Sequence, residues 1–177
     1  RAKPDHLAAI EAHGIQPIDL VCVNLYPFAA TVAKPNVALE DAIENIDIGG
    51  PAMIRSAAKN HSGVMVVVNP DDYTPLLEEM AANGGTVSLA TRRQLAAKAY
   101  AHTGQYDAYI SQWLNQRFAK EEGNDTPDFP QELALGYRKA QDCRYGENPH
   151  QRAAFYVQPG VTEPCVANAK QLHGKEL

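Results

Sequence analysis

Cysteine is scarce in this sequence, and its spacing argues against two kinds of structural site. The 177 residues include only Cys22, Cys143 and Cys165. An odd, scattered set is untypical of a disulfide framework and suits a reducing compartment. None of the three has a second cysteine or a histidine at metal-ligand spacing, so we predict no metal site. We therefore expect three free thiols in a cytoplasmic protein.

An excess of positive charge and long apolar runs are also missing. Lys and Arg number 16 against 21 Asp and Glu, a formal net charge of −5. This balance argues against a nucleic-acid surface but not against a small phosphorylated ligand, which needs only local positive charge. No apolar run reaches the length of a membrane span, and the first residues lack the apolar core of a signal peptide. The chain begins without Met, so we expect it to be part of a longer protein.

Two short apolar runs predict strands separated by helices. Residues 18–23 and 64–68 are rich in Val, Ile, Leu and Met, as in strands buried on both faces. Helices are predicted at residues 5–13, 37–45, 52–61 and 72–82, and Gly14 is placed to end the first. This alternation predicts an α/β fold with a parallel sheet and right-handed crossovers. Two strands cannot bury a sheet, so we expect further strands upstream of this chain.

A long helix is predicted next, followed by a linker. Residues 89–118 carry apolar or aromatic side chains at every third or fourth position, which indicates one packing face. The face comprises Leu95, Ala99, His102, Tyr106, Ile110 and Trp113. We interpret it as core or subunit packing. Residues 120–130 are acidic and contain Pro and Gly, a linker composition, and a strand is predicted at 153–157.

The strongest single candidate for chemistry is the turn Ile46-Asp-Ile-Gly-Gly-Pro51 before a predicted helix. Gly49 and Gly50 permit a positive φ or close approach to a ligand, and Pro51 suits the first helical position. The free N–H groups at such a helix start favour an anion: a phosphate, a carboxylate or a developing oxyanion. The alternative is a tight turn without a ligand.

Polar side chains near this turn have both a functional and a structural interpretation. Arg55 and Lys59 are four residues apart and share one side of the predicted helix, where they could enter a cleft or stay solvated. Asn24 and Tyr26 follow the first predicted strand, at the edge where open α/β sheets bind ligands. They could equally be a turn former and a core aromatic.

A second polar group lies near the end of the chain. Arg144, Tyr145, Asn148 and His150 surround Gly146 and Pro149. Arg suits bidentate phosphate contacts, and His can transfer protons near neutral pH. A surface turn is the alternative for so Pro- and Gly-rich a stretch.

Several of these segments occur in the order seen in one family of bifunctional purine-biosynthesis enzymes. They are Asn24-Leu-Tyr-Pro-Phe28, Ile46-Asp-Ile-Gly-Gly-Pro51, Arg55, Ala57-Ala-Lys-Asn-His61 and Arg144-Tyr-Gly-Glu-Asn-Pro-His-Gln151. The chain resembles this family over essentially its whole length. The family's activities are phosphoribosylaminoimidazolecarboxamide (AICAR) formyltransferase and inosine monophosphate (IMP) cyclohydrolase, the last two steps of de novo purine biosynthesis.

The resemblance implies two domains. Residues 1–139 would be the C-terminal portion of the cyclohydrolase domain with its linker, a methylglyoxal-synthase-like, doubly wound α/β fold with its N-terminal strands missing. Residues 140–177 would begin a formyltransferase domain of cytidine-deaminase-like architecture. The family forms homodimers, and the aromatic helix would be a reasonable part of that contact.

The resemblance also implies site residues and ligands. Lys59, Asp47 and Tyr26 match catalytic residues of ring closure. The substrate-binding positions would be Val23, Asn24, Ile48, Gly49, Gly50 and Arg55, with Arg144 and Tyr145 in the formyltransferase site. The nucleotides would be AICAR, formyl-AICAR and IMP. Ring closure would need no bound cofactor, and 10-formyltetrahydrofolate would be the co-substrate of formyl transfer.

The implied roles follow from the chemistry of ring closure. Lys59 and the N–H groups of residues 47–49 would stabilise charge on the formyl oxygen, Asp47 would accept the amide proton, and Tyr26 would orient the amide or relay that proton. The family's phosphate loop and its formyltransferase Lys-His pair match nothing in this chain, so we expect the chain alone to be inactive. A nucleotide-phosphate-binding regulatory module and a scaffold held by the long helix are the alternatives. The fold alone does not distinguish these alternatives. The combination of Lys59, Asp47 and Tyr26 favours the enzyme, because a pure binding module needs no acid–base set.

Overall fold

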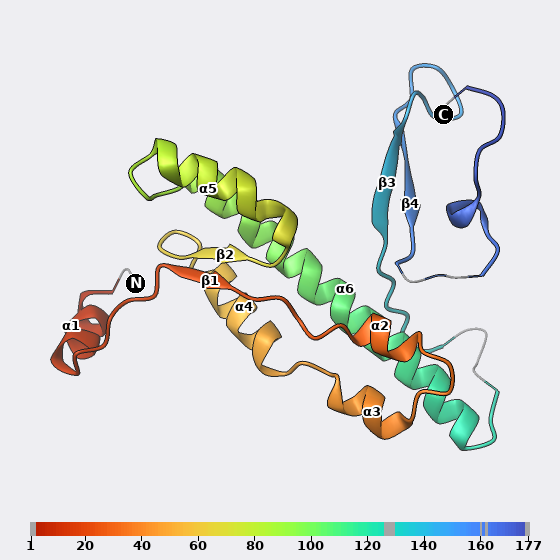
Figure 1. The fold of residues 1–177 in the computed structure, drawn as a ribbon, viewed down its shortest axis with the longest axis horizontal. Helices are drawn as coiled ribbons and strands as arrows, with labels where there is room; N and C mark the ends of the chain where they lie inside the picture. The colour runs from red at the N-terminus through yellow and green to blue at the C-terminus, as the bar shows by residue number, and fades with distance from the viewer. Residues whose placement is uncertain (1–2, 126–129, 160, 162, 176–177) are drawn as a thin grey trace. The chain divides into compact units, whose positions relative to one another are not determined.

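The chain folds into two compact units. The computed structural model describes residues 3–125, 130–159, 161 and 163–175 (Figure 1). Unit 1 comprises residues 1–27 and 43–104, and unit 2 comprises residues 28–42 and 105–177. Within the described ranges, no helix combines the length and the apolar character that a membrane span requires.

Unit 1 contains a two-stranded parallel sheet, as predicted. Strand β1 (Leu20–Cys22) pairs with β2 (Met65–Val67), with Leu20 opposite Met65 and Cys22 opposite Val67 (Figure 1). All of β2 is buried, but Leu20 is 46% exposed and Cys22 is exposed. The prediction that residues 18–23 are buried on both faces is therefore wrong. Successive side chains alternate across a strand, and only Val21 of β1 packs against the core.

The core of unit 1 forms where helices cover β2. Helix α4 (Gly49–Lys59) contributes Ile54, Ala57 and Ala58, which are at most 5% exposed. The two alanines keep the helix surface small, so its backbone can lie close to the strands. Helix α5 (Tyr73–Ala82), preceded by the 3₁₀ turn η1 (Pro70–Asp72), adds Leu76. The start of the long helix α6 (Leu89–Glu121) adds Leu95, Ala96 and Ala99.

The predicted helices are present, with shifted bounds. Helix α1 (Pro4–Ala12) ends before Gly14, whose φ of 63° confirms its predicted role as a terminator. Helix α3 (Leu39–Glu44) and α5 match their predicted ranges within about two residues. Helix α6 continues to Glu121, three residues beyond the prediction. Of the predicted linker, residues 126–129 lie outside the described residues.

The helix expected at 52–61 begins three residues early, and this changes the geometry of the Gly-Gly turn. Gly49 and Gly50 belong to the first turn of α4, and neither has a positive φ. Pro51 is the third helical residue, where its missing N–H still costs no intrahelical hydrogen bond. Of the two roles predicted for these glycines, the positive φ is therefore absent, and the prediction of Pro51 at the first helical position is wrong.

Unit 2 is built around one aromatic residue and one hairpin. Phe28 begins helix α2 (Phe28–Val32), is 1% exposed, and contacts Tyr109 and Trp113 edge-on at centroid distances of 6.1 and 5.7 Å. The interpretation of the aromatic face of α6 as packing is confirmed at Trp113. Tyr109, which the predicted face omitted, packs beside it.

The hairpin of unit 2 consists of β3 (Arg138–Cys143) and β4 (Ala153–Val157), paired antiparallel with an irregularity between Lys139 and Gln141. It confirms the strand predicted at 153–157, and a short 3₁₀ turn η2 (Val166–Asn168) follows. The sequence pattern did not predict β3, whose residues are mostly polar. The predicted domain boundary after residue 139 falls within β3 and stays a prediction.

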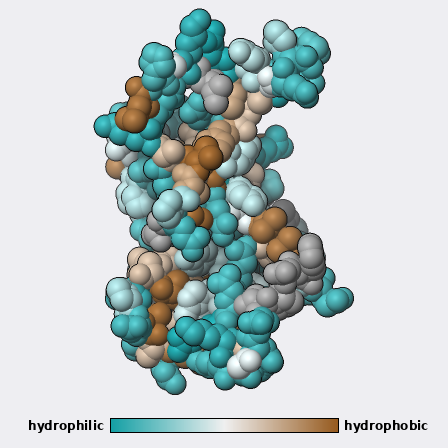
Figure 2. Space-filling view, turned by 90° about the vertical axis from the view of Figure 1, so that its right-hand side faces the viewer, coloured by the Kyte–Doolittle hydropathy of each residue, from teal (hydrophilic) through white to brown (hydrophobic). Residues whose placement is uncertain are grey.

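The surface agrees with the polar composition. Figure 2 shows hydrophilic side chains over most of the visible face, with hydrophobic ones in separate patches. Exposed hydrophobic residues include Ile15, Ile18 and Leu20, which precede or belong to β1.

Candidate functional site

The carboxyl end of β1 brings two predicted site segments together. The ladder continues past the strand, because the N–H of Val23 donates to the carbonyl oxygen of Val67 at 3.0 Å. Asn24 and Tyr26 come next, and Tyr26 is 56% exposed. The backbone N–H of Tyr26 donates to Oδ2 of Asp47 at 3.3 Å. The structure thus joins the segment after β1 to the turn before α4, two segments that are distant in sequence.

Asp47 is held by two backbone donors. Its Oδ1 accepts a 2.7 Å hydrogen bond from the N–H of Gly50, and its Oδ2 accepts the bond from Tyr26. The bond from Gly50 satisfies an N–H of the first turn of α4 that has no partner within the helix, so Asp47 stabilises the start of α4. The half-buried carboxylate is therefore fixed in place at the edge of the sheet.

Gly50 is required by the position of Asp47. A Cβ atom at residue 50 would lie 2.5 Å from Oδ2 of Asp47 and 2.7 Å from Cδ2 of Leu25. Both distances are shorter than contacts that real Cβ atoms make, so glycine at position 50 lets the Asp47 carboxylate lie against the first turn of α4. Gly49 differs, because a Cβ there would have nothing within 4 Å. The close approach predicted at these glycines is therefore made at Gly50 by the chain's own Asp47 and Leu25, not by a ligand.

The anion expected at the start of α4 is already present, because it is the carboxylate of Asp47. A phosphate or an oxyanion at the same N–H groups would face this negative charge. Gly50 already donates to Asp47, and Pro51 has no N–H, so neither residue offers a free N–H to an anion. A ligand group with a proton to donate suits this position better.

Arg55 and Lys59 lie farther along α4, on its exposed side. The guanidinium of Arg55 lies 5.2 Å from the ring centroid of Tyr100, a cation–π contact, and the Tyr100 hydroxyl donates to the Arg55 carbonyl oxygen. Lys59 is exposed and ends the helix. The 11 residues of α4 rise about 1.5 Å each, so Gly49 and Lys59 are roughly 15 Å apart along the axis. Joint action of Lys59 and the N–H groups of 47–49 on one oxygen has no support in this geometry.

Ile48, the residue after Asp47, does not belong to the core of unit 1. It is 78% exposed, at the position immediately before α4. So large an exposed apolar side chain beside Asp47 offers a surface on which a flat ring could lie.

A tyrosine that the sequence analysis missed completes this sheet edge. The Oη of Tyr73, at the start of α5, accepts a 3.0 Å hydrogen bond from Nδ2 of Asn24. The Cys22 thiol donates to the same oxygen at 3.4 Å. The hydrogen bond with Cys22 raises the pKa of Tyr73, the bond from Asn24 opposes this, and burial adds to the increase. The available signal was that Tyr73 follows the second strand, as Asn24 follows the first.

The second predicted group forms the loop between β3 and β4 in unit 2. Arg144 and Tyr145 are exposed at its start. Gln151 closes the loop, because its carbonyl oxygen accepts from the N–H of Gly146 at 2.9 Å and its Oε1 accepts from the N–H of Asn148 at 2.9 Å. The loop therefore holds the exposed guanidinium of Arg144 on a defined turn, and Gln151 is a structural residue that the pattern did not single out.

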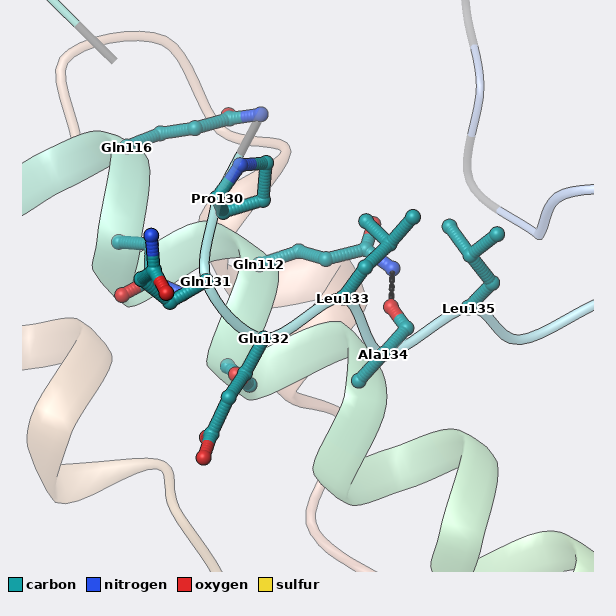
Figure 3. Close-up of a pocket in the computed structure, with 10 residues that line it drawn as sticks. Gln112, Gln116, Pro130, Gln131, Glu132, Leu133, Ala134 and Leu135 are labelled. Carbon is teal, nitrogen blue, oxygen red and sulfur yellow. Dashed lines mark hydrogen bonds between the residues drawn. The ribbon is translucent and has the colours of Figure 1, made fainter. Parts of the chain in front are cut away.

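A pocket of about 800 Å³ lies in unit 2 and is lined by none of the predicted site residues. Residues 130–135 run along α6 there, opposite Gln112 and Gln116 (Figure 3). The side-chain amide of Gln112 donates to the carbonyl oxygen of Ala134 and accepts from Nε2 of Gln158 at 3.1 Å. These bonds explain the pocket as the gap beside a chain segment anchored to α6.

Metal ligands do not gather anywhere in the described ranges: no three His, Cys, Asp or Glu side chains there are placed to share an ion. The three cysteines are free thiols, as expected.

Comparison with known proteins gives matches over nearly the whole chain. Residues 57–177 match the family model described as AICARFT/IMPCHase bienzyme, and residues 1–52 match that of the MGS-like domain. The chain is 53% identical over 172 residues to the bifunctional purine biosynthesis protein PurH of Lysinibacillus sphaericus (strain C3-41). That match covers 97% of this chain but 32% of the relative, so the chain spans about a third of its length.

A solved structure is also similar. The chain of the crystal structure of ForH is 37% identical, with a TM-score of 0.56, over 63% of this chain and 57% of that one. Together with the MGS-like match, this supports the predicted α/β class of the first domain.

Proposed function

Because this chain belongs to the AICARFT/IMPCHase bienzyme family, we propose that the full-length protein containing it catalyses the last two steps of de novo purine biosynthesis. The first step transfers a formyl group from 10-formyltetrahydrofolate to AICAR. The second closes formyl-AICAR to IMP with loss of water. The edge around Asp47 serves ring closure, and the loop at Arg144 and Tyr145 binds the ribonucleotide for formyl transfer.

Ring closure is an intramolecular reaction. The carboxamide nitrogen attacks the formyl carbon and loses one of its two protons as the C–N bond forms. The formyl oxygen takes up this proton and the proton of the formamide nitrogen, and it leaves as water as the C–O bond breaks and the C=N bond of the ring forms. Because both reacting groups belong to one molecule, holding them in attack geometry supplies much of the acceleration. The protein must add an acceptor for the N–H proton and a donor for the oxygen.

The fixed carboxylate of Asp47 is the observation that carries this proposal. Its oxygens accept the backbone N–H groups of Gly50 and Tyr26, which hold the carboxylate at the sheet edge. A carboxylate oxygen can accept from more than one donor. A carboxamide N–H of the substrate is such a donor. Tyr26, exposed beside it, would orient the amide or relay its proton. Ile48 would support the ring, and Val23 and Asn24 would contact the nucleotide at the strand end.

Lys59 is the proposed proton donor to the formyl oxygen. Side chains on a helix point toward its N-terminus, so that of Lys59 leans toward the Asp47 end of α4. The carboxamide and the formyl group are neighbours on the imidazole ring, so the Lys59 side chain must reach the same end of the substrate as Asp47, across most of the length of α4. Arg55, between them, would face the substrate's polar groups.

The test compares the two activities in the full-length protein. Asp47→Asn and Lys59→Ala should each lower ring closure by roughly 10²–10⁴-fold, the usual size of an acid–base contribution, and leave formyl transfer unchanged. Glu78→Gln and Lys120→Ala, exposed residues outside the site, are the matched controls. Full ring-closure rates in both site variants would contradict the proposed roles. Nucleotide binding by the wild-type protein without turnover would favour the regulatory-module alternative.

Three further expectations belong to this proposal. The protein would act in the cytoplasm as a homodimer, which sedimentation of the full-length protein can test. The 177-residue chain by itself would not close the ring, because no segment of it matches the family's phosphate loop. A ring-closure assay of the isolated chain tests this directly, and clear activity would mean that the loop is dispensable.

A further inference from the structure

The hydroxyl of Tyr73 connects the two strands at their carboxyl ends. Cys22 ends β1 opposite Val67 of β2, so the chain leaves both strands at one edge of the sheet. From β2 it passes through η1 to Tyr73, whose ring packs against the core of unit 1. From β1 it passes directly to Asn24. The 3.0 Å hydrogen bond from Asn24 to Tyr73 joins the segment that follows β1 to the segment that follows β2.

This contact determines which polar atom Asn24 offers to a ligand. A side-chain amide has a donor end and an acceptor end. The Nδ2 end of Asn24 is bound to Tyr73, and no group in the described ranges donates to its Oδ1. The side chain is exposed at the edge where open α/β sheets bind ligands. Asn24 therefore presents an acceptor at this edge.

The Cys22 thiol strengthens this arrangement. Its sulfur donates to the same tyrosine oxygen at 3.4 Å, so Oη accepts from two side chains. The ring of Tyr73 is fixed by packing, whereas Asn24 is exposed and follows the strand. The tyrosine is thus the rigid partner, and the asparagine is the group it orients.

We propose that Tyr73 is a positioning residue for ring closure: it holds Asn24 so that Oδ1 accepts a hydrogen bond from a donor on the nucleotide, a ribose hydroxyl or an amide N–H. This inference rests on the proposed function, because it requires Asn24 to contact the substrate. Tyr73 itself does not touch the reacting atoms. Loss of its hydroxyl should weaken substrate binding and leave the chemical step largely intact.

The experiment is a double-mutant cycle in the full-length protein, with ring closure of formyl-AICAR as the readout. Tyr73→Phe keeps the ring and removes only the hydroxyl. It should raise KM roughly three- to tenfold, the effect of one hydrogen bond, with a much smaller change in kcat. Asn24→Ala should raise KM at least as much. The double variant should match Asn24→Ala alone, because residues that act through one contact are not additive.

Two controls separate positioning from structural damage. Tyr156→Phe removes an exposed tyrosine hydroxyl in β4 and should leave KM for ring closure unchanged. Formyl transfer by Tyr73→Phe should equal the wild-type rate. The thermal midpoint of Tyr73→Phe should fall by no more than that of Asn24→Ala.

The possible results lead to distinct conclusions. The proposal is wrong if Tyr73→Phe raises KM by the same factor with and without Asn24, or if it has no effect while Asn24→Ala does. It is equally wrong if kcat alone falls, since that would place Tyr73 in the chemical step. No effect of either variant would remove Asn24 from the site. Only absent ring closure in the wild-type protein would overturn the proposed function itself.

Discussion

The two units differ in how they bury apolar surface. Unit 1 has a continuous core that joins α4, β2, α5 and the start of α6. Among the described residues, the buried hydrophobic side chains of unit 2 are only Phe28, Ala42 and Ala108. Its hairpin has no fully buried residue: β3 is almost entirely exposed and β4 is half-buried.

This difference separates two ways of holding a site. In unit 1, the candidate residues follow strands and a helix whose inner faces are packed, so their positions are set by the core. In unit 2, Arg144 and Tyr145 sit on a hairpin loop closed by its own hydrogen bonds. An isolated two-stranded hairpin is marginally stable in water. We therefore expect the loop to depend more on local bonds and on further partners than the Asp47 edge does.

The largest effect on this difference between the units is expected from truncating Phe28, against which Tyr109 and Trp113 pack. Phe28→Ala should destabilise the protein by about 3–5 kcal/mol, because a large buried ring is lost from its contacts with Tyr109 and Trp113. Hydrogen exchange of the full-length protein should show the loss in α2 and the second half of α6. Phe118→Ala, at a 43% exposed position of α6, is the control and should have a small effect. Equal losses in both variants would contradict this view of unit 2.

The matching change in unit 1 is Ile54→Ala. Ile54 is 0% exposed and lies in the middle of α4, so its truncation should cost about 2–5 kcal/mol. The readout is faster amide exchange in α4 and β2, with the β3–β4 hairpin unaffected. Ile15→Ala, at a 56% exposed position, should change little. Equal acceleration of exchange in the hairpin would show that the stabilities of the two units are coupled.

A smaller effect is expected from one methyl group at the site. Gly50→Ala should destabilise by about 1–3 kcal/mol, because its Cβ would displace Asp47 or Leu25. Ring closure should fall with it. Gly49→Ala is the matched variant: its Cβ has open space, and Ala favours helix, so stability should hold or rise slightly. Denaturant titration and the ring-closure assay measure both. If the two variants lose equal stability, the close approach at Gly50 is not a constraint.

The smallest expected effect concerns pH and His102. Burial, and then the charge of Lys98, lowers the pKa of this histidine from its ordinary 6.5. A lowered folded-state pKa favours the neutral form, so the stabilisation is complete above about pH 6.5 and is lost as pH falls through the folded pKa. Protection factors of the amides in the first half of α6, corrected for intrinsic exchange at each pH, should fall over that range, with the β3–β4 hairpin as the internal reference. His102→Gln should flatten the pH dependence; an unchanged slope would assign it to other groups.

Much of unit 1 could be predicted from the sequence, because the relevant signals are local. Hydrophobic runs mark β1 and β2, helical spacing marks α3 and α5, and Gly14 marks the end of α1. The same signals failed at β3, since a mostly polar hairpin strand has no apolar pattern. They also failed on the burial of β1, because which face a helix covers depends on how distant segments pack.

The candidate site shows the same division. By itself, the sequence determined the parallel α/β alternation, the motifs around Asn24, Asp47 and Lys59, and the family that those motifs resemble. Only the tertiary structure decided that Asp47 is the anion at the start of α4, that Gly50 lets it lie there, and that Asn24 donates a hydrogen bond to Tyr73. The physical reason is that each of these depends on atoms from segments far apart in the chain, whose distances no local pattern encodes.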